Sequence, residues 1–223
     1  MSVATNDYLA AINHLPAGAV LRIDDVPWDE YENLLADLGD GYSVRVFYDQ
    51  GRMEIMAPAS THEKPKGAIN RLVTALSDEL DIDIESLGST TLKREIKAQG
   101  AEPDDGFYIQ HAALVIGKDD LDLQYDPPPD LVIEIDRTSA SLDKFAIYAG
   151  LGVPEIWRVA GRRVEFYLLA DDYYAESTTS NAFPFLTAAA LSDFLEIVLD
   201  SGGRRGARQF RSWIREHRTT STE

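Results

Sequence analysis

The chain has 223 residues, of which 44% are apolar and 26% charged, a composition typical of a globular protein and unlike that of a disordered or fibrous one. We expect a cytoplasmic protein, because neither a membrane-length apolar run nor a secretory signal pattern is visible. Zero cysteines exclude disulfides, thiolate nucleophiles and cysteine-ligated zinc, and the four histidines show no paired metal-ligand spacing.

The net charge of −17 combines 38 acidic and 21 basic residues and is unevenly distributed. Residues 1–40 carry eight acids and one arginine, whereas residues 201–223 carry six arginines and two acids. Because nonspecific affinity for nucleic acid comes from cations that neutralise phosphates, the overall charge opposes such binding. We expect a lead-in with an acidic helix over 1–41, one compact domain over 42–200, and an arginine-rich helix and tail over 201–223.

Hydrophobic spacing predicts the elements of the amino-terminal half. The segment 28–38 ends at glycines, as a helix does, and alternation on both sides of the turn at 49–51 predicts a hairpin. Apolar residues recur with helical spacing over 61–80. The predicted order is helix 28–38, strands 42–48 and 52–56, helix 61–80, then strands 82–87, 90–96 and 107–110.

The apolar run over 130–136, with its embedded acids, predicts a strand buried on both faces in the middle of a sheet. The elements predicted after it are helix 139–151, strands 153–159, 163–169 and 173–177, and helices 187–199 and 204–217. Strands with a strand–helix–strand crossover indicate a mixed α/β fold, with a central mixed sheet flanked by helices.

Two charged residues interrupt these apolar patterns. Alternation places Glu134 on one face of the central strand beside a second acid, and a buried carboxylate needs a partner. That partner is a hard cation such as Mg²⁺, or else Glu134 and Asp136 lie near an exposed sheet end or pair with a basic side chain. Lys144 projects beside the apolar stripe of its helix, where it needs an anion unless its stem alone is buried.

Two further acids have ordinary structural explanations. Asp104, within residues 103–106, is typical of a turn in which aspartate caps its own backbone. Glu63 follows Ser60 by three residues and completes a capping box for the long helix. Neither residue points to chemistry on its own.

Taken in order, these residues resemble the Uma-two family, often named "putative restriction endonuclease", within the PD-(D/E)XK nuclease-like superfamily. The resemblance covers about residues 42–195. It is carried by GRMEIMAP at 51–58, EPDDGFYI at 102–109, PPPDLVIEID at 127–136, and Leu142-Asp-Lys144, Tyr148 and GVPEIW at 152–157.

The resemblance implies a restriction-endonuclease-like fold with a magnesium-dependent site, in which Mn²⁺ can replace Mg²⁺. By position, Asp104 and Glu134 are catalytic metal ligands, and Glu63 is the acid of the first helix, which holds a second ion or a water. The superfamily places a lysine two residues after the second acid, where this chain has Asp136. Family members supply that lysine from the following helix, here Lys144, as a catalytic cation.

The implied partner is nucleic acid, with DNA expected, and the implied assembly is a homodimer. Candidate contacts are the basic residues Lys64, Lys66, Lys93, Arg94, Lys97, Arg204, Arg205, Arg208, Arg211, Arg215 and Arg218. The tail arginines share one helical face that could instead pair with the acidic amino-terminal region or with a second subunit. A noncatalytic interaction protein of the same fold is the alternative, favoured by the net charge and by Asp136. A carboxylate-pair glycosidase has no motif in its favour.

Overall fold

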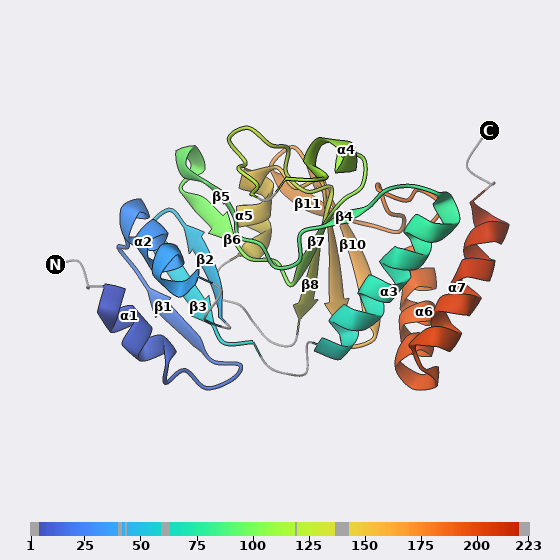
Figure 1. Ribbon diagram of the computed structural model, residues 1–223, viewed down its shortest axis with the longest axis horizontal. Helices are drawn as coiled ribbons and strands as arrows, with labels where there is room; N and C mark the ends of the chain where they lie inside the picture. The colour runs from blue at the N-terminus through green and yellow to red at the C-terminus, as the bar shows by residue number, and fades with distance from the viewer. Residues whose placement is uncertain are drawn as a thin grey trace.

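The computed structural model describes residues 5–39, 42, 44–58, 63–118, 120–136 and 143–218. In this part of the chain the strands form two sheets, of five and six strands, which lie side by side in Figure 1. Helices α1 (Thr5–Ile12) and α2 (Trp28–Leu38) lie with the first sheet, and α3 (Glu63–Leu80), α6 (Ala188–Ser201) and α7 (Gly203–His217) lie with the second. No helix among these residues is long and apolar enough to cross a membrane.

The first sheet has the order β1-β3-β2-β6-β5. Its strands are β1 (Val20–Ile23), β2 (Arg45–Asp49), β3 (Arg52–Met56), β5 (Leu92–Arg94) and β6 (Gln99–Ala101). The predicted hairpin is present as β2 and β3, which pair antiparallel. Strand β1 was not predicted, and it pairs with β3, so the lead-in contributes an edge strand to this sheet. The domain boundary at residue 41 stays a prediction.

The second sheet has the order β11-β10-β9-β8-β7-β4 and is mixed, as predicted. Its strands are β4 (Glu85–Ser86), β7 (Asp105–Tyr108), β8 (Leu131–Asp136), β9 (Glu155–Ala160), β10 (Arg163–Ala170) and β11 (Tyr173–Ser177). Strands β8 and β9 are parallel, and β7 pairs antiparallel with β8. Helix α5 (Lys144–Leu151) makes the crossover between β8 and β9, while α4 (Ala112–Val115) follows β7.

Strand β8 is buried on both faces, as its sequence predicts. Leu131 and Ile133 join the core under α3, α6 and α7. Val132 points to the other side and packs with Ile147 of α5 and with Phe47 of the first sheet. Helix α5 therefore lies between the two sheets, and one face of β8 looks toward it.

Several predicted boundaries were wrong: the strand expected over 82–87 is only Glu85–Ser86, the strand expected over 107–110 is Asp105–Tyr108, and two further changes have a clear local cause. The segment 90–96 is a strand only over β5, because the chain turns through a short 3₁₀ helix (Glu95–Lys97) and reverses at Ala98, whose φ is 47°. The helix predicted from Ser139 begins at Lys144, because Asp143 is its N-cap and accepts hydrogen bonds from the backbone of Phe145 and Ala146. Residues 139–142 lie outside the described part of the chain.

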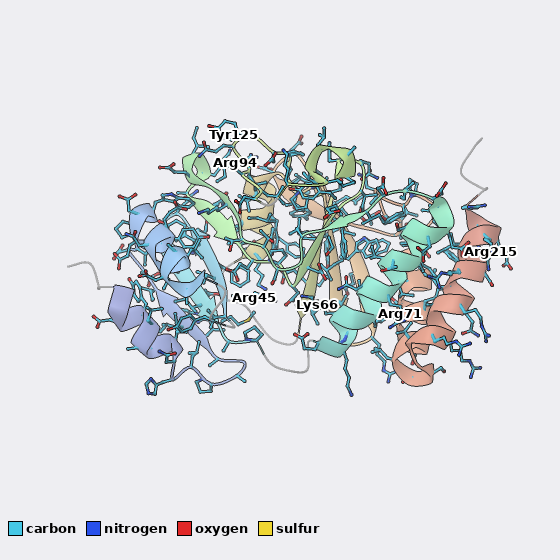
Figure 2. All side chains as sticks on the ribbon, viewed as in Figure 1. Arg45, Lys66, Arg71, Arg94, Tyr125 and Arg215 are labelled. Carbon is cyan, nitrogen blue, oxygen red and sulfur yellow. The ribbon has the colours of Figure 1, made fainter. Side chains whose placement is uncertain are left out.

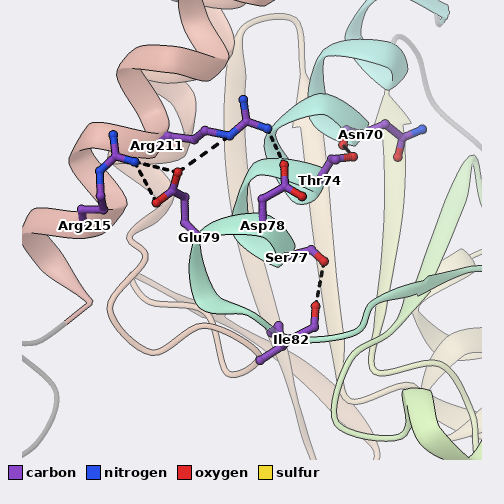
Figure 3. Close-up of polar contacts among 8 residues, drawn as sticks. All are labelled: Asn70, Thr74, Ser77, Asp78, Glu79, Ile82, Arg211 and Arg215. Carbon is purple, nitrogen blue, oxygen red and sulfur yellow. Dashed lines mark hydrogen bonds and ion pairs between the residues drawn. The ribbon is translucent and has the colours of Figure 1, made fainter.

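Two arginines in the second half of α7 pair with the end of α3 (Figure 3). Arg211 forms an ion pair with Asp78, and Arg215 Nη1 lies 2.8 Å from Glu79 Oε1. Arg218 donates to the backbone carbonyl of Glu79. These three arginines therefore bind within the chain, which is neither of the two partners that the sequence suggested. Ion pairs of this exposure add little stability, so α7 is held mainly by its buried apolar residues.

A polar cluster lies between α2 and the first sheet. Glu102 accepts a hydrogen bond from Thr91 Oγ1 at 3.0 Å. Burial raises the pKa of Glu102 from its ordinary 4.5 to about 7, although Thr91 and Arg45 act in the opposite direction. Within the described residues, the hydroxyl of Tyr31 and Nε of Arg45 are buried without hydrogen-bond partners. The folded protein therefore favours the protonated form of Glu102.

We expect the free energy of unfolding to fall between about pH 4.5 and 7, because the folded state keeps a proton on Glu102 that the unfolded state releases. Glu102→Gln should remove this part of the pH dependence and raise stability at pH 8 by on the order of 2 kcal/mol, with little effect at pH 4.5. Urea denaturation of wild type and variant at both pH values measures this change in the free energy of unfolding. If the free energies of unfolding of variant and wild type differ by the same amount at both pH values, Glu102 is not the source of the pH dependence.

Candidate active site

The candidate site centres on the Glu134 side chain, which is 2% exposed and extends from β8 toward α5. Its Oε2 accepts a hydrogen bond from Lys144 Nζ at 2.6 Å, and its Oε1 accepts one from the Tyr148 hydroxyl at 2.5 Å. Both oxygens of this buried carboxylate are thus engaged by one helix.

Helix α5 supplies these two donors because Lys144 and Tyr148 are four residues apart and share one face. The Lys144 side chain is 13% exposed. Its ammonium also lies 4.3 Å from the ring centroid of Phe47 on β2, within the range of a cation–π contact. The structure therefore brings together the lysine and the glutamate that the sequence singled out, and places them against the first sheet.

Asp104 lies immediately before β7 and is 5% exposed. Its Oδ2 accepts a hydrogen bond from the backbone N–H of Ile135 at 2.8 Å. That N–H belongs to the peptide unit that joins Glu134 to Ile135, so the Asp104 carboxylate lies beside the backbone of Glu134. The next residue, Asp105, accepts a hydrogen bond from Asn70 Nδ2 at 2.7 Å and ties α3 to β7. The Pro-Asp segment is therefore more than a self-capped turn.

Burial and the neighbouring charges shift the pKa of Glu134 in opposite directions. Burial raises the pKa of Glu134, Lys144 lowers it, and the nearby Asp104 raises it again, with a net rise. Burial and the Glu134 carboxylate raise the pKa of Tyr148 well above its usual value. Tyr148 therefore keeps its proton and acts as a hydrogen-bond donor that fixes the orientation of Glu134.

The remaining predicted residues are less closely placed. Glu63 is the exposed first residue of α3. Among the described residues, no three histidine, aspartate or glutamate side chains converge as a metal-binding group, so a ligand role for Glu63 stays a prediction. Asp136 is the last residue of β8, and its side chain lies outside the description. The capping residue Ser60 also lies outside the described residues.

The two buried acids fit a divalent cation in residue type. Asp104 and Glu134 offer hard oxygen donors, and the pKa of Glu134 is raised in part by Asp104, a repulsion that a cation would relieve. Each carboxylate oxygen has about two acceptor positions, so the hydrogen bonds to Glu134 leave room for a ligand. Asp104 and Glu134 are therefore the residues that would hold the metal.

Sequence reasoning missed several neighbours of this site. Arg158 lies opposite Glu134 in the parallel register of β8 and β9, so both side chains are on one face. It also lies 3.6 Å from Glu165 on β10. Glu54, the cross-strand partner of Phe47, is buried and pairs with Arg22. An arginine interrupting the apolar strand 155–160 was a signal comparable to that of Glu134.

We expect Lys144→Met to lower the free energy of unfolding by about 3 kcal/mol at pH 8, because it leaves the Glu134 carboxylate buried without its cation. The loss should be smaller at pH 5, where Glu134 takes up a proton more readily. Lys64→Met, at the exposed start of α3, is the matched control and should change stability by less than about 0.5 kcal/mol. Equal losses in both variants would show that the Lys144–Glu134 pair does not matter to the fold.

Comparisons of the chain with known proteins identify its family. The model of the family Uma2, described as "Putative restriction endonuclease", matches residues 28–200. The crystal structure of a "putative nuclease belonging to DUF820" from Anabaena variabilis ATCC 29413 resembles this chain with a TM-score of 0.51 and 14% identity, over 76% of this chain and 99% of that one. At that identity the likeness shows the fold, which agrees with the predicted mixed α/β class. A search of the curated proteins found no match. Because the family model spans well over half of its length, the chain belongs to the Uma2 family.

Proposed function

We propose that this protein is an endonuclease that hydrolyses phosphodiester bonds of nucleic acid with Mg²⁺ or Mn²⁺. The observation that carries the proposal is the buried Glu134 carboxylate, which contacts Lys144 at 2.6 Å and has a second buried acid, Asp104, beside its backbone. Membership of a family described as "Putative restriction endonuclease" supports the reaction class.

Each residue has a distinct role in the proposed reaction. A divalent cation held by Asp104 and Glu134 would activate the attacking water and neutralise charge on the phosphate. The positive charge of the Lys144 ammonium, beside Glu134, would help to stabilise the negative charge that develops on the phosphoryl oxygens. The Phe47 ring contacts the Lys144 ammonium, and Tyr148 keeps the Glu134 carboxylate fixed. Glu63 is proposed to hold a second ion or a water.

A noncatalytic protein of the same fold is the second candidate. The observation in its favour is that Lys144 already balances the charge of Glu134, so the site is electrostatically reasonable without a metal. Asp136 at the usual lysine position points the same way. Assembly as a homodimer is a prediction that fits either function.

Cleavage assays on plasmid DNA, single-stranded DNA and RNA test the proposal. We expect wild-type cleavage in Mg²⁺ or Mn²⁺ that stops in a chelator, and losses of about 100-fold or more in Glu134→Gln and Lys144→Met. The controls are Glu196→Gln and Lys118→Met, which change an exposed carboxylate and an exposed lysine that is paired with Asp126.

Cleavage that persists in a chelator, or that is undiminished in Glu134→Gln, would contradict the proposed endonuclease. A wild type that cleaves none of the three substrates would favour the noncatalytic candidate.

A further inference from the structure

We propose that a phosphate-binding strip on α3 and the α6–α7 turn holds the backbone of DNA beside the candidate site. The strip consists of the six basic residues Lys64, Lys66, Arg71, Arg204, Arg205 and Arg208. It rests on the proposed function for its link to catalysis. Half of the strip belongs to α7, which follows the last residue of the family match at 200, so family membership does not imply it.

The cations of the strip have no anionic partner within the described part of the chain. Among the described residues, none of the six makes an ion pair or a side-chain hydrogen bond, whereas Lys93 pairs with Glu32 and Arg94 donates to the carbonyl of Leu123. Arg211 and Arg215 are engaged by the end of α3. In a chain with a net charge of −17, cations without ion-pair partners on the packed helices α3 and α7 are a site where an external anion would be favoured.

The two halves of the strip meet at Gly203. A Cβ atom on this glycine would lie 2.5 Å from Arg71 Nε, so the Arg71 side chain lies directly against the α6–α7 turn. Arg204, Arg205 and Arg208 line a shallow hollow of about 480 Å³ together with residues 201–203. Figure 2 shows Arg71 between α3 and the two carboxyl-terminal helices, and Lys66 near the centre of the molecule.

The strip leads to the candidate site. Asn70, which precedes Arg71, contacts Asp105 at 2.7 Å, and Asp105 is the neighbour of Asp104. In Figure 1 the carboxyl end of β8, the amino end of α3 and the α6–α7 turn lie toward the same, lower side of the molecule. Lys64 and Arg71 are separated by about 10 Å of helix. A strand bound along the strip would therefore present several phosphates in line with the site.

The chemistry of the strip fits a phosphate backbone. Five of its six members are exposed to solvent: Lys64, Arg71, Arg204, Arg205 and Arg208. Four of these five are arginines, whose guanidinium fork matches phosphate oxygens. Contacts of this kind position a nucleic acid without reading its sequence. The strip thus supplies local positive charge for phosphate binding on a chain whose net charge is negative.

Fluorescence anisotropy of a labelled DNA duplex and of its single strand, in a chelator so that no cleavage occurs, tests the strip. The variant Arg204→Gln/Arg205→Gln/Arg208→Gln should bind the duplex about tenfold more weakly or worse, and the slope of log K against log salt should become shallower by roughly 2 to 3. The control Arg52→Gln/Lys118→Gln/Arg163→Gln changes the net charge equally at exposed cations that already pair with acids of the chain, and it should bind nearly as wild type.

A second strip variant, Lys64→Gln/Arg71→Gln, repeats the test on α3, and circular dichroism checks that each variant is folded. Equal weakening in the strip and control variants, or no wild-type binding at low salt, overturns the strip. Wild type that binds DNA through the strip but cuts no substrate supports the strip and contradicts the endonuclease. Undiminished cleavage and binding in both strip variants overturns the strip and leaves the endonuclease standing.

Discussion

The structure depends on placing one carboxylate, that of Glu134, in the middle of a buried strand. An uncompensated charge there would cost several kcal/mol. Lys144 and Tyr148, one turn apart on α5, offset this cost by donating hydrogen bonds to the Glu134 carboxylate. Their position requires α5 to lie between the two sheets, and Lys144 in turn contacts Phe47 of the first sheet. The crossover helix, the packing of the first sheet on it and the candidate chemistry are therefore one arrangement.

The hydrogen-bond partners of the buried acids distinguish those with a structural role, Glu155 and Asp130, from the candidate functional residue Glu134. Glu155 accepts hydrogen bonds from Trp157 Nε1 at 2.6 Å and from the backbone N–H of Ala182 at 2.8 Å. It is the first residue of β9, three positions before Arg158. Asp130 accepts from the backbone of Ile109 and from His111. Both are satisfied by donors that fix loops. Glu134 differs because a second carboxylate raises its pKa, which is the condition that a cation would relieve.

Local patterns predicted much of this fold but little of its long-range pairing. Periodicity was sufficient for α3, the β2–β3 hairpin and the two faces of β8, because each repeats within a few residues. It could not predict β1, whose half-exposed residues form a strand through pairing with β3. Nor could it predict that Arg211 and Arg215 of α7 bind the end of α3, more than 130 positions away. Within the site, the sequence alone indicated that Lys144 needs an anionic partner. The proximity of Arg158 to Glu134 depends on the register between β8 and β9, which the sequence does not reveal.

The claim that Asp104 and Glu134 form a cation site is tested most directly by calorimetric titration. Mg²⁺ and Mn²⁺ would be titrated at low salt into metal-free wild type, Asp104→Asn and the exposed control Asp171→Asn. The geometry predicts that wild type and Asp171→Asn bind alike and that Asp104→Asn loses the binding. Equal binding by wild type and Asp104→Asn, or no binding by wild type, would contradict the assignment of these carboxylates as metal ligands.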